Sequence, residues 1–293
     1  MRKKLLFFVV FIIAVSFVLV SCTPSEKEPA LSNKHRIERD KLIFAGSGTN
    51  LALTRLLVEH YAAKGHNQIE VPESIGSSGA IRAIRDGSID LGLISRPLTK
   101  EEFDSGLRQI PYARVGLVIA VNPIVVDTGI TSEELVEVIK GEKKTWSDGN
   151  PIIVLIMYEK DTTNLVLAKE IQGYQTAIEE ALKKKLWQVL YTDAAMVGAL
   201  EKSPYSIGFS DTSTMAITNP AIKALKLNGI YPNPGTIADG TFPLTKELYF
   251  VYKEGGSLEK VQPFLNFVRS EEGKRVILSG DAIPFNGETH GRR

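Results

Sequence analysis

The sequence predicts an α/β fold in which mostly parallel β-sheets are flanked by helices. Short, almost wholly apolar runs, such as residues 89–94 and 114–121, have the composition of strands that are buried on both faces. These runs alternate with segments whose apolar residues recur at helical spacing, as in residues 53–61. In addition, a loop rich in glycine or hydroxyl groups leads into a helix at three places. Such alternation implies parallel strands joined by right-handed crossovers.

The first of these loops lies within residues 44–57, FAGSGTNLALTRLL, which follow the pattern of strand, turn and helix. Gly48 has no Cβ, so the backbone there can bend tightly and come close to a ligand. Ser47, Thr49 and Asn50 place polar side chains beside the free N–H groups of the first helical turn. This arrangement is typical of anion binding at a helix N-terminus, and an ordinary turn with an N-cap is the alternative interpretation.

Two further loops repeat the pattern, and the repetition favours a binding role. Residues 75–81, IGSSGAI, open a second helix, and residues 160–164, KDTTN, open a helix in the second half of the chain. Each helix N-terminus offers unpaired N–H groups and a partial positive charge. We therefore expect the loops to converge on one oxyanion.

The remaining elements of the first half continue the alternation. Gly65 and Gly87 follow helical patterns and are expected to end the first two helices. Thr99 and Glu102 have the spacing of a capping box, which predicts a third helix. The strands expected in this half, after the opening one, are residues 69–71, 89–94 and 114–121.

The alternation restarts after residue 123. Thr131 and Glu134 form a second capping box, and Gly141 is expected to end the helix that they begin. Either Thr192 or Asp193 can cap a helix over residues 194–201. The other elements expected in this half are strands at residues 152–157, 206–209 and 244–252, and helices at residues 175–185, 261–269 and 271–278.

The N-terminus has the pattern of an export signal followed by a lipid attachment site. Basic residues precede an apolar run, residues 5–20, that is short for a membrane-spanning helix. Cys22, the only cysteine of the chain, follows a small residue as in the bacterial lipobox. We therefore expect residues 1–22 to be a lipoprotein signal peptide that ends at the lipidated Cys22. Residues 23–40, which are charged and contain prolines, are expected to be a flexible tether.

The composition argues against several classes of protein. The chain has 35 Lys and Arg against 34 Asp and Glu, so no excess of positive charge indicates nucleic acid as a partner. Its four histidines have neither metal-ligand spacing nor a Ser or Cys partner, so we expect no metal, no other cofactor and no catalytic residue. The part after the tether, roughly 250 residues, is long enough for one large domain or two lobes.

Several segments, taken in order, carry a resemblance to a known family. They are AGSGT, IGSSGAIRAI, IDLGLISRPL, VNP after a buried strand, TSEEL with GEKKTWSDGNPI, YSIGF, FPLTKELYFVYK and FVRSEEGKRVILSGDAIPF. Spread over residues 41–285, they resemble the phosphate-binding substrate-binding proteins of ABC transporters. The resemblance implies a two-lobed, type II periplasmic-binding-protein-like fold with two hinge crossings, near residues 118–121 and 249–252.

The same resemblance implies where the lobes begin and end. Residues 41–121 together with residues 228–285 would form the first lobe, and residues 122–227 would form the second. Residues 286–293 are expected to be a disordered tail. An oxyanion would be clamped between the helix N-termini of the two lobes.

The resemblance also implies ligand-binding positions in the first two loops. Thr49 and Asn50 match the ligands of the first loop, with Gly48 as a neighbouring candidate. Ser77 matches the serine of the second loop, with Ser78 as its neighbour.

The two residues that follow the predicted strand at residues 89–94 differ among members of the family. Ser95 stands where some members have an aspartate that accepts the proton of hydrogen phosphate, whereas others have Ser-Arg as here. An acidic acceptor admits a protonated oxyanion and repels a fully ionised one, so a serine weakens the discrimination of phosphate from sulfate. Arg96 is expected to add a charge-assisted contact with the ligand.

The third loop departs from the family pattern Arg-x-x-Gly-Ser-Gly-Thr. Residues 158–164, YEKDTTN, lack the arginine and both glycines. Asp161 is either an alternative proton acceptor or the N-cap of the following helix. The groups that can still donate hydrogen bonds or supply positive charge belong to Thr162, Thr163, Asn164 and Lys160.

These features together predict a monomeric extracytoplasmic protein, lipid-anchored to a bacterial membrane, that captures an inorganic oxyanion. The resemblance favours phosphate as ligand and delivery to an ABC permease by closure of the lobes. One alternative is a sensor or a binding lipoprotein for another oxyanion such as sulfate, which the altered third loop permits. A second alternative is a phosphatase, but the sequence has no metal cluster, no nucleophile with a base and no paired carboxylates near the loops.

Overall fold

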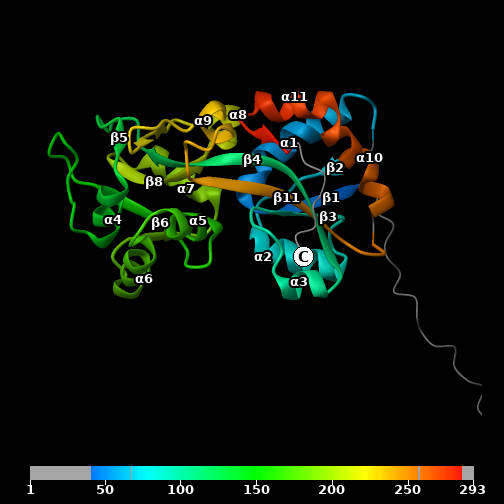
Figure 1. Ribbon diagram of the computed structural model, residues 1–293, viewed down its shortest axis with the longest axis horizontal. Helices are drawn as coiled ribbons and strands as arrows, with labels where there is room; N and C mark the ends of the chain where they lie inside the picture. The colour runs from blue at the N-terminus through cyan, green and yellow to red at the C-terminus, as the bar shows by residue number, and fades with distance from the viewer. Residues whose placement is uncertain (1–40, 67, 257, 286–293) are drawn as a thin grey trace, which may run out of the picture. The chain divides into compact units, whose positions relative to one another are not determined.

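Strands and helices alternate through the part of the chain that the structure describes, as the sequence predicts (Figure 1). The computed structural model describes residues 41–285 apart from residues 67 and 257. The predicted signal peptide with Cys22, the tether at residues 23–40 and the tail at residues 286–293 lie outside the described residues. Within the described part, no helix is both long enough and apolar enough to pass through a bilayer.

The structure has strands at most of the predicted positions and adds several short ones. The strands are β1 (Leu42–Gly46), β2 (Ile69–Glu70), β3 (Leu91–Ile94), β4 (Leu107–Val121), β5 (Gly129–Ile130), β6 (Ile153–Met157), β7 (Gln188–Leu190), β8 (Ser206–Asp211), β9 (Lys223–Ala224), β10 (Lys226–Leu227), β11 (Thr245–Lys253) and β12 (Ile283–Pro284). The longest, β4, begins well before the predicted strand at residues 114–121 because its first half pairs with β11.

The helices follow the predicted capping signals. They are α1 (Gly48–Ala62), α2 (Gly76–Asp86), α3 (Lys100–Asp104), α4 (Ser132–Lys140), α5 (Thr162–Glu170), α6 (Tyr174–Lys184), α7 (Asp193–Lys202), α8 (Thr212–Thr218), α9 (Pro234–Ala238), α10 (Leu258–Arg269) and α11 (Glu271–Ser279). Both predicted capping boxes are present, at the starts of α3 and α4. Gly87 and Gly141 end α2 and α4 in the left-handed conformation, which glycine adopts without a steric cost.

Ten strands form one mixed sheet, in which eight follow the order β2-β1-β3-β11-β4-β8-β6-β7. At its two sides, strands that are linked through helices pair in parallel, as crossover connections require. At its centre, β4 and β11 pair antiparallel with each other. In addition, β11 pairs antiparallel with β3, and β4 pairs antiparallel with β8. The centre differs from the expected parallel pattern because these two strands are the connections between the sides, and they run in opposite directions.

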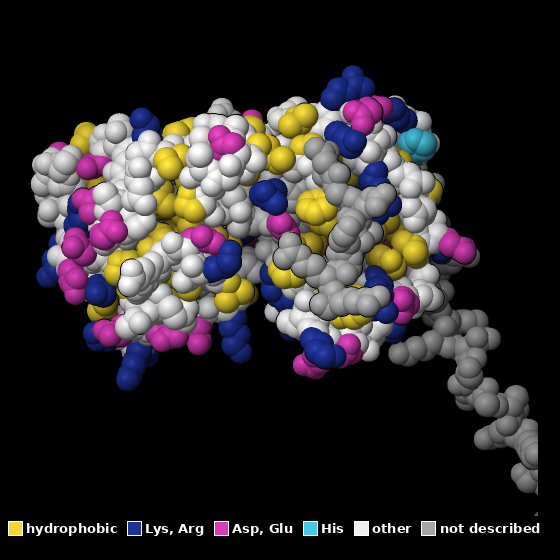
Figure 2. Space-filling model, in the orientation of Figure 1, with side chains coloured by type: hydrophobic (Ala, Val, Ile, Leu, Met, Phe, Trp, Pro, Cys, Tyr) yellow, Lys and Arg dark blue, Asp and Glu magenta, His cyan; other side chains and the backbone are white. Residues whose placement is uncertain are grey.

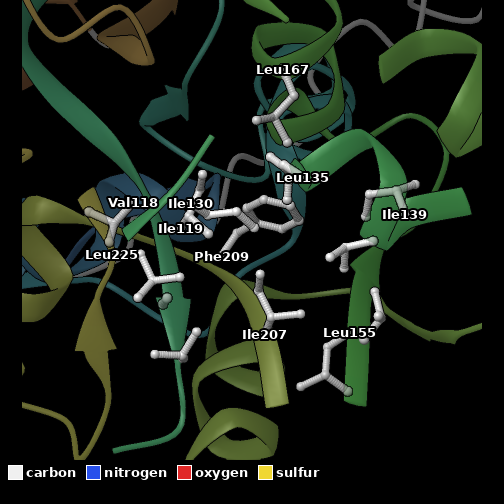
Figure 3. Close-up of a cluster of buried hydrophobic side chains, with 14 of the residues drawn as sticks. Val118, Ile119, Ile130, Leu135, Ile139, Leu155, Leu167, Ile207, Phe209 and Leu225 are labelled. Atoms are coloured by element: carbon white, nitrogen blue, oxygen red, sulfur yellow. The ribbon is translucent and has the colours of Figure 1, made fainter. Parts of the chain in front are cut away.

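The apolar side chains form separate cores at the two sides of this sheet. One core is built from residues between Leu117 and Leu244, and Figure 3 shows part of it, with β4, β6, β8, α4 and α5 contributing side chains such as Val118, Phe209 and Leu155. The other side has two adjoining clusters, drawn from residues 44–115 and 248–282. We call the side with these two clusters lobe 1 and the side with the first core lobe 2.

The strands β4 and β11 pass through both lobes (Figure 1). Along β4 the core contacts change between Val115 and Leu117. At β11 they change between Leu244, which directly precedes the strand, and Leu248 within it. The predicted crossings at residues 118–121 and 249–252 lie a few residues further along the same strands. The predicted lobe boundaries stay predictions, because both strands continue without a break where the core changes.

The visible surface carries charges of both signs. On the face drawn in Figure 2, Lys and Arg side chains are interspersed with Asp and Glu side chains over both lobes. This distribution agrees with the near balance of acidic and basic residues in the sequence.

Candidate functional site

Hydroxyl groups from three loops and from Ser95, which follows β3, meet between the lobes. We call residues 46–50, 75–79 and 160–164 the first, second and third loops. Ser47 Oγ lies 3.0 Å from Ser95 Oγ, which in turn lies 2.9 Å from Thr162 Oγ1. The backbone N–H of Ser95 donates to Ser77 Oγ over 3.4 Å. All four side chains are buried, and we call them the hydroxyl cluster.

The hydroxyl cluster retains hydrogen-bond donors for a ligand. Each hydroxyl carries one proton, so Ser47, Ser95 and Thr162 together have three. The contact between Ser47 and Ser95 and the contact between Ser95 and Thr162 use two of them, and one remains. Ser77 acts as an acceptor in its contact with Ser95, so that contact leaves its own proton available. A group of donors with this surplus suits a ligand that only accepts hydrogen bonds, such as an oxyanion.

The helices that begin at the first and second loops have N-termini without a side-chain cap. Ser47 and Ile75 occupy the N-cap positions of α1 and α2, and neither side chain accepts a hydrogen bond from the first turn. In α2 the N–H of Gly76 donates to Ser74 Oγ over 3.2 Å, which leaves the N–H groups that follow it. Free N–H groups at a helix N-terminus and the positive end of its dipole both attract anions. The two uncapped ends therefore favour negative charge at the hydroxyl cluster.

A buried lysine supplies a full positive charge beside these groups. Lys246 lies on β11 and is only 3% exposed. Its Nζ atom lies 2.9 Å from Thr163 Oγ1 in lobe 2 and 3.2 Å from Thr49 Oγ1 in lobe 1. An ammonium group has three N–H donors, so these two contacts leave one for a ligand. The two groups that Nζ contacts directly are hydroxyls, and the nearest carboxylate in this network, that of Asp193, is reached only through Thr49. The remaining N–H donor is therefore available to a ligand that accepts hydrogen bonds, such as an anion.

Asp193, the first residue of α7, adds a carboxylate to the same network. Thr49 Oγ1 donates to Asp193 Oδ1 over 3.1 Å. A Cβ atom added to Gly48 would lie 2.1 Å from Asp193 Oδ2, so the carboxylate lies directly against the first loop. Burial raises the pKa of Asp193, the charge of Lys246 opposes this rise, and the charge of Asp161 adds to it.

The side chains of the two asparagines that the sequence predicts as ligands make hydrogen bonds within the protein. Asn50 Nδ2 donates to the hydroxyl oxygen of Tyr112 over 3.1 Å. Asn164 Oδ1 accepts from the hydroxyl of Tyr174 over 3.1 Å, and its Nδ2 donates to the backbone oxygen of Tyr158 over 2.9 Å. Burial raises the pKa of both Tyr112 and Tyr174, so the two phenols stay neutral partners. These contacts indicate that the asparagines hold the first and third loops in place.

The structure pairs Arg96 with a neighbouring carboxylate. Its guanidinium group makes two hydrogen bonds of 2.7 Å to Glu102, the residue that closes the capping box of α3. The hydrogen bond from Arg96 lowers the pKa of Glu102, so the pair stays charged. The sequence predicts Arg96 as the cation that contacts the ligand, but in the structure its guanidinium is paired with Glu102. The positive charge that contacts the hydroxyls of Thr49 and Thr163 belongs to Lys246.

The other predicted candidates lie at the edge of the site. Asp161 Oδ1 accepts from the backbone N–H of Thr163 over 2.8 Å, so of its two predicted roles the N-cap is the one that the geometry matches. Ser78 and Lys160 are exposed, and Gly48 forms the turn against which Asp193 packs. Among the residues that the structure describes, no group of three or more His, Cys, Asp or Glu has a metal-binding arrangement.

Lys246 is not among the residues predicted from the sequence, although its position in the sequence carries a signal. The residue belongs to the predicted strand at residues 244–252, where side chains alternate between two faces. Lys246 shares a face with Leu244 and Leu248, both fully buried, so a charge falls on a core-facing position. Because lysine is almost never fully buried without a partner, that position alone marks a candidate site.

The family of the chain follows from its sequence. Residues 31–272, more than half of the chain, match the PBP superfamily domain. The chain therefore belongs to the PBP superfamily, and the predicted α/β fold of the periplasmic-binding-protein type is confirmed.

Individual relatives match most of the chain at low identity. The phosphate-binding protein PstS of Borreliella burgdorferi is 21% identical over 262 residues, covering 84% of this chain and 91% of the relative. The PstS of Staphylococcus saprophyticus is 26% identical over 254 residues, covering 80% and 77%. A crystal structure from Clostridium perfringens, described as a phosphate ABC transporter substrate-binding protein with bound phosphate, superposes with a TM-score of 0.74 at 20% identity, covering 84% of this chain and 99% of the other.

Proposed function

We propose that this protein is a monomeric extracytoplasmic substrate-binding protein that captures phosphate between its lobes and delivers it to the permease of an ABC transporter. The observation that carries the proposal is the convergence of the hydroxyl cluster, two uncapped helix N-termini and the buried Lys246. Relatives named as phosphate-binding proteins, which match most of this chain, support phosphate as the oxyanion.

In the proposed complex, hydrogen bonds from both lobes surround the ligand. Ser77 and Ser95 donate from lobe 1, Thr162 donates from lobe 2, and the first turns of α1 and α2 contribute backbone N–H groups. Lys246 neutralises part of the ligand charge through its remaining N–H donor. Since Thr49 and Thr163 contact Nζ from opposite lobes, closure of the lobes fixes the ammonium at the ligand.

Isothermal titration calorimetry on the chain without its signal and tether tests the ligand. We expect one phosphate to bind per protein, with weaker binding of sulfate and of phosphate monoesters. A phosphatase assay on the same preparation is the control for the enzyme alternative. Absence of heat with every oxyanion in the panel would contradict the proposal, and tighter binding of sulfate than of phosphate would favour the alternative ligand.

Removal of single hydroxyl groups tests the position of the ligand. Ser77→Ala and Thr162→Ala are each expected to cost about 1.5–3 kcal/mol of binding free energy, roughly ten- to hundred-fold in dissociation constant. The melting temperature of the unliganded protein should change little, because neither hydroxyl is needed to fill a core. Ser78→Ala is the comparison, since this neighbouring hydroxyl is exposed. Equal losses in Ser77→Ala and Ser78→Ala would place the ligand at the outer surface of α2 instead.

The proposed location depends on Cys22, which lies outside the described residues. Cleavage before Cys22 and lipidation of its thiol would anchor the protein to the membrane on the outer side. In cells, Cys22→Ala is expected to release the protein from the membrane fraction or to leave the precursor unprocessed. Fractionation and immunoblotting measure both outcomes. A Cys22→Ala variant that stays membrane-bound with the mobility of the mature protein would refute lipidation at this residue.

A further inference from the structure

Two tyrosines of lobe 2 form a stacked pair. Tyr158 directly follows β6 and Tyr191 directly follows β7, so the parallel pairing of these strands brings the two residues together. Their ring centroids lie 5.8 Å apart, and the angle between the ring planes is 19°. Tyr158 is half-buried, whereas Tyr191 is 72% exposed. Tyr191 is therefore the outer ring and Tyr158 the inner ring of what we call the tyrosine pair.

The inner ring reaches from lobe 2 to lobe 1. A Cβ atom added to Gly76 would lie 3.9 Å from the hydroxyl oxygen of Tyr158, so the phenol lies beside the first residue of α2. Ser77, which follows Gly76, belongs to the hydroxyl cluster. Burial raises the pKa of Tyr158, and the charges of Asp161 and Asp193 raise it further, so the phenol lies near both carboxylates and stays protonated. The tyrosine pair therefore bridges the lobes beside the proposed anion site.

We infer that the tyrosine pair covers the anion site on its solvent side, so that the site excludes phosphate monoesters and releases inorganic phosphate slowly; the inference rests on the proposed function. The hydroxyl cluster is buried, Gly76 and Tyr158 are half-buried, and Tyr191 is exposed, so solvent lies in the direction of the tyrosine pair. The carbon substituent of a monoester has to extend towards solvent, because the groups on the inner side, such as Lys246, are buried. In that direction the substituent meets the ring of Tyr158.

The backbone at Tyr158 is held independently of the ring. Its N–H donates to the backbone oxygen of Leu190 over 3.0 Å. Its backbone oxygen accepts hydrogen bonds from the N–H of Asp161 over 3.0 Å and from Asn164 Nδ2 over 2.9 Å. These contacts hold the chain that leads into the third loop without help from the phenol ring. Truncation of the side chain should therefore remove the cover and leave the loops that bind the ligand in place.

A direct hydrogen bond from the phenol to the ligand is the competing interpretation. A phenol O–H can donate, and that of Tyr158 lies near the N-terminus of α2. The two roles depend on different parts of the side chain, since a cover needs the ring and a ligand contact needs the hydroxyl. Tyr158→Phe separates them because it keeps the ring and removes the hydroxyl.

Tyr158→Ala is the main test. Calorimetry with sodium phosphate, methyl phosphate and glycerol phosphate gives the preference for phosphate over each ester as a ratio of dissociation constants. We expect this preference to fall roughly ten-fold or more, because a blocking side chain acts mainly by rejecting the larger ligand. The release rate of radiolabelled phosphate, chased with unlabelled phosphate in a rapid filtration assay, should rise by a similar factor.

Three further variants identify the cause of such a change. Tyr158→Phe should keep the preference and the release rate within about two-fold of the wild-type values, because the ring remains. Tyr191→Ala should shift both quantities in the direction of Tyr158→Ala, because its ring stacks on that of Tyr158. Tyr231→Ala is the matched control: this exposed tyrosine follows β10, outside the three loops, and its replacement should change neither quantity.

Two results would overturn the inference. One is an unchanged preference for phosphate in Tyr158→Ala. The other is a loss of phosphate affinity in Tyr158→Phe as large as that in Tyr158→Ala, since the hydroxyl would then act as a ligand. If Tyr158→Ala does not fold, Tyr191→Ala decides, because a ring that is so exposed is not part of a core. Wild-type preference and release rate in that variant would then overturn the inference.

A failure of the proposed function would look different. Wild-type protein would then bind neither phosphate nor its esters. If wild-type protein binds phosphate and Tyr158→Ala keeps the full preference over both esters, the proposed function stands and the tyrosine pair does not cover the site.

Discussion

Replacement of Lys246 by methionine is expected to weaken phosphate binding by about 3 kcal/mol or more, roughly a hundred-fold or more in dissociation constant. The ammonium group is the cation that contacts both Thr49 and Thr163, and its loss removes a charge-assisted hydrogen bond from a buried site. The hydroxyl cluster and the helix N-termini would remain, so binding should be weakened rather than shifted to another place. Calorimetry on both proteins measures the difference.

The same replacement should also lower the stability of the unliganded protein. Lys246 is buried, and its positive charge acts on the carboxylates of Asp193 and Asp211, so its removal leaves these buried groups without that compensation. We therefore expect the melting temperature without ligand to fall, and the increase that phosphate produces in wild-type protein to become much smaller. The loss of the phosphate-induced increase separates the role of Lys246 in binding from its role in the unliganded fold.

Lys253→Met is the control for the loss of one positive charge. Lys253 lies on the same strand, β11, but is exposed and donates to the backbone oxygen of Arg85. Its replacement should change phosphate affinity by less than about two-fold, since exposed charges are screened by solvent and salt. Wild-type affinity in Lys246→Met would show that the anion does not bind beside Lys246.

Much of the fold could be predicted because its signals are local. The capping boxes at Thr99 and Thr131 and the glycines at positions 87 and 141 each depend on residues within one or two helical turns, and all four act as predicted. The antiparallel pairing of β4 with β11 could not be predicted in this way, since it joins residues more than a hundred positions apart. The alternation of strands and helices indicates parallel strands joined by helices. It does not specify that β4 and β11, which connect the two lobes, pair with each other.

The site could be predicted in part, for the same reason. The loops that contain Ser77 and Thr162 have local sequence patterns, and the structure brings their hydroxyls to Ser95. The sequence favours Arg96 as the cation because it directly follows the candidate Ser95, whereas in the structure the guanidinium of Arg96 makes two hydrogen bonds to Glu102. Lys246 reaches Thr49 from a strand 197 residues away, a contact that only tertiary structure reveals.

Gly46→Ala is expected to lower the free energy of unfolding by about 3 kcal/mol or more. A Cβ atom at this position would lie 1.9 Å from the backbone oxygen of Leu93, its parallel partner on β3. Backbone atoms inside a sheet cannot move aside as the end of a flexible side chain can. The methyl group should therefore force β1 and β3 apart, and denaturant unfolding followed by circular dichroism would measure the loss.

The damage should extend to ligand binding, because the end of β1 positions two of the loops. The backbone N–H of Ser47 donates to Leu93 O over 2.8 Å, and the N–H of Ile75 donates to Gly46 O over 3.0 Å, so separation of the strands displaces both loops. Gly198→Ala is the matched control: its Cβ would meet no atom within 4 Å, and alanine inside α7 should stabilise by about 0.5–1 kcal/mol. If Gly46→Ala were as stable as wild-type protein, β1 and β3 would not pair as closely as this structure has them.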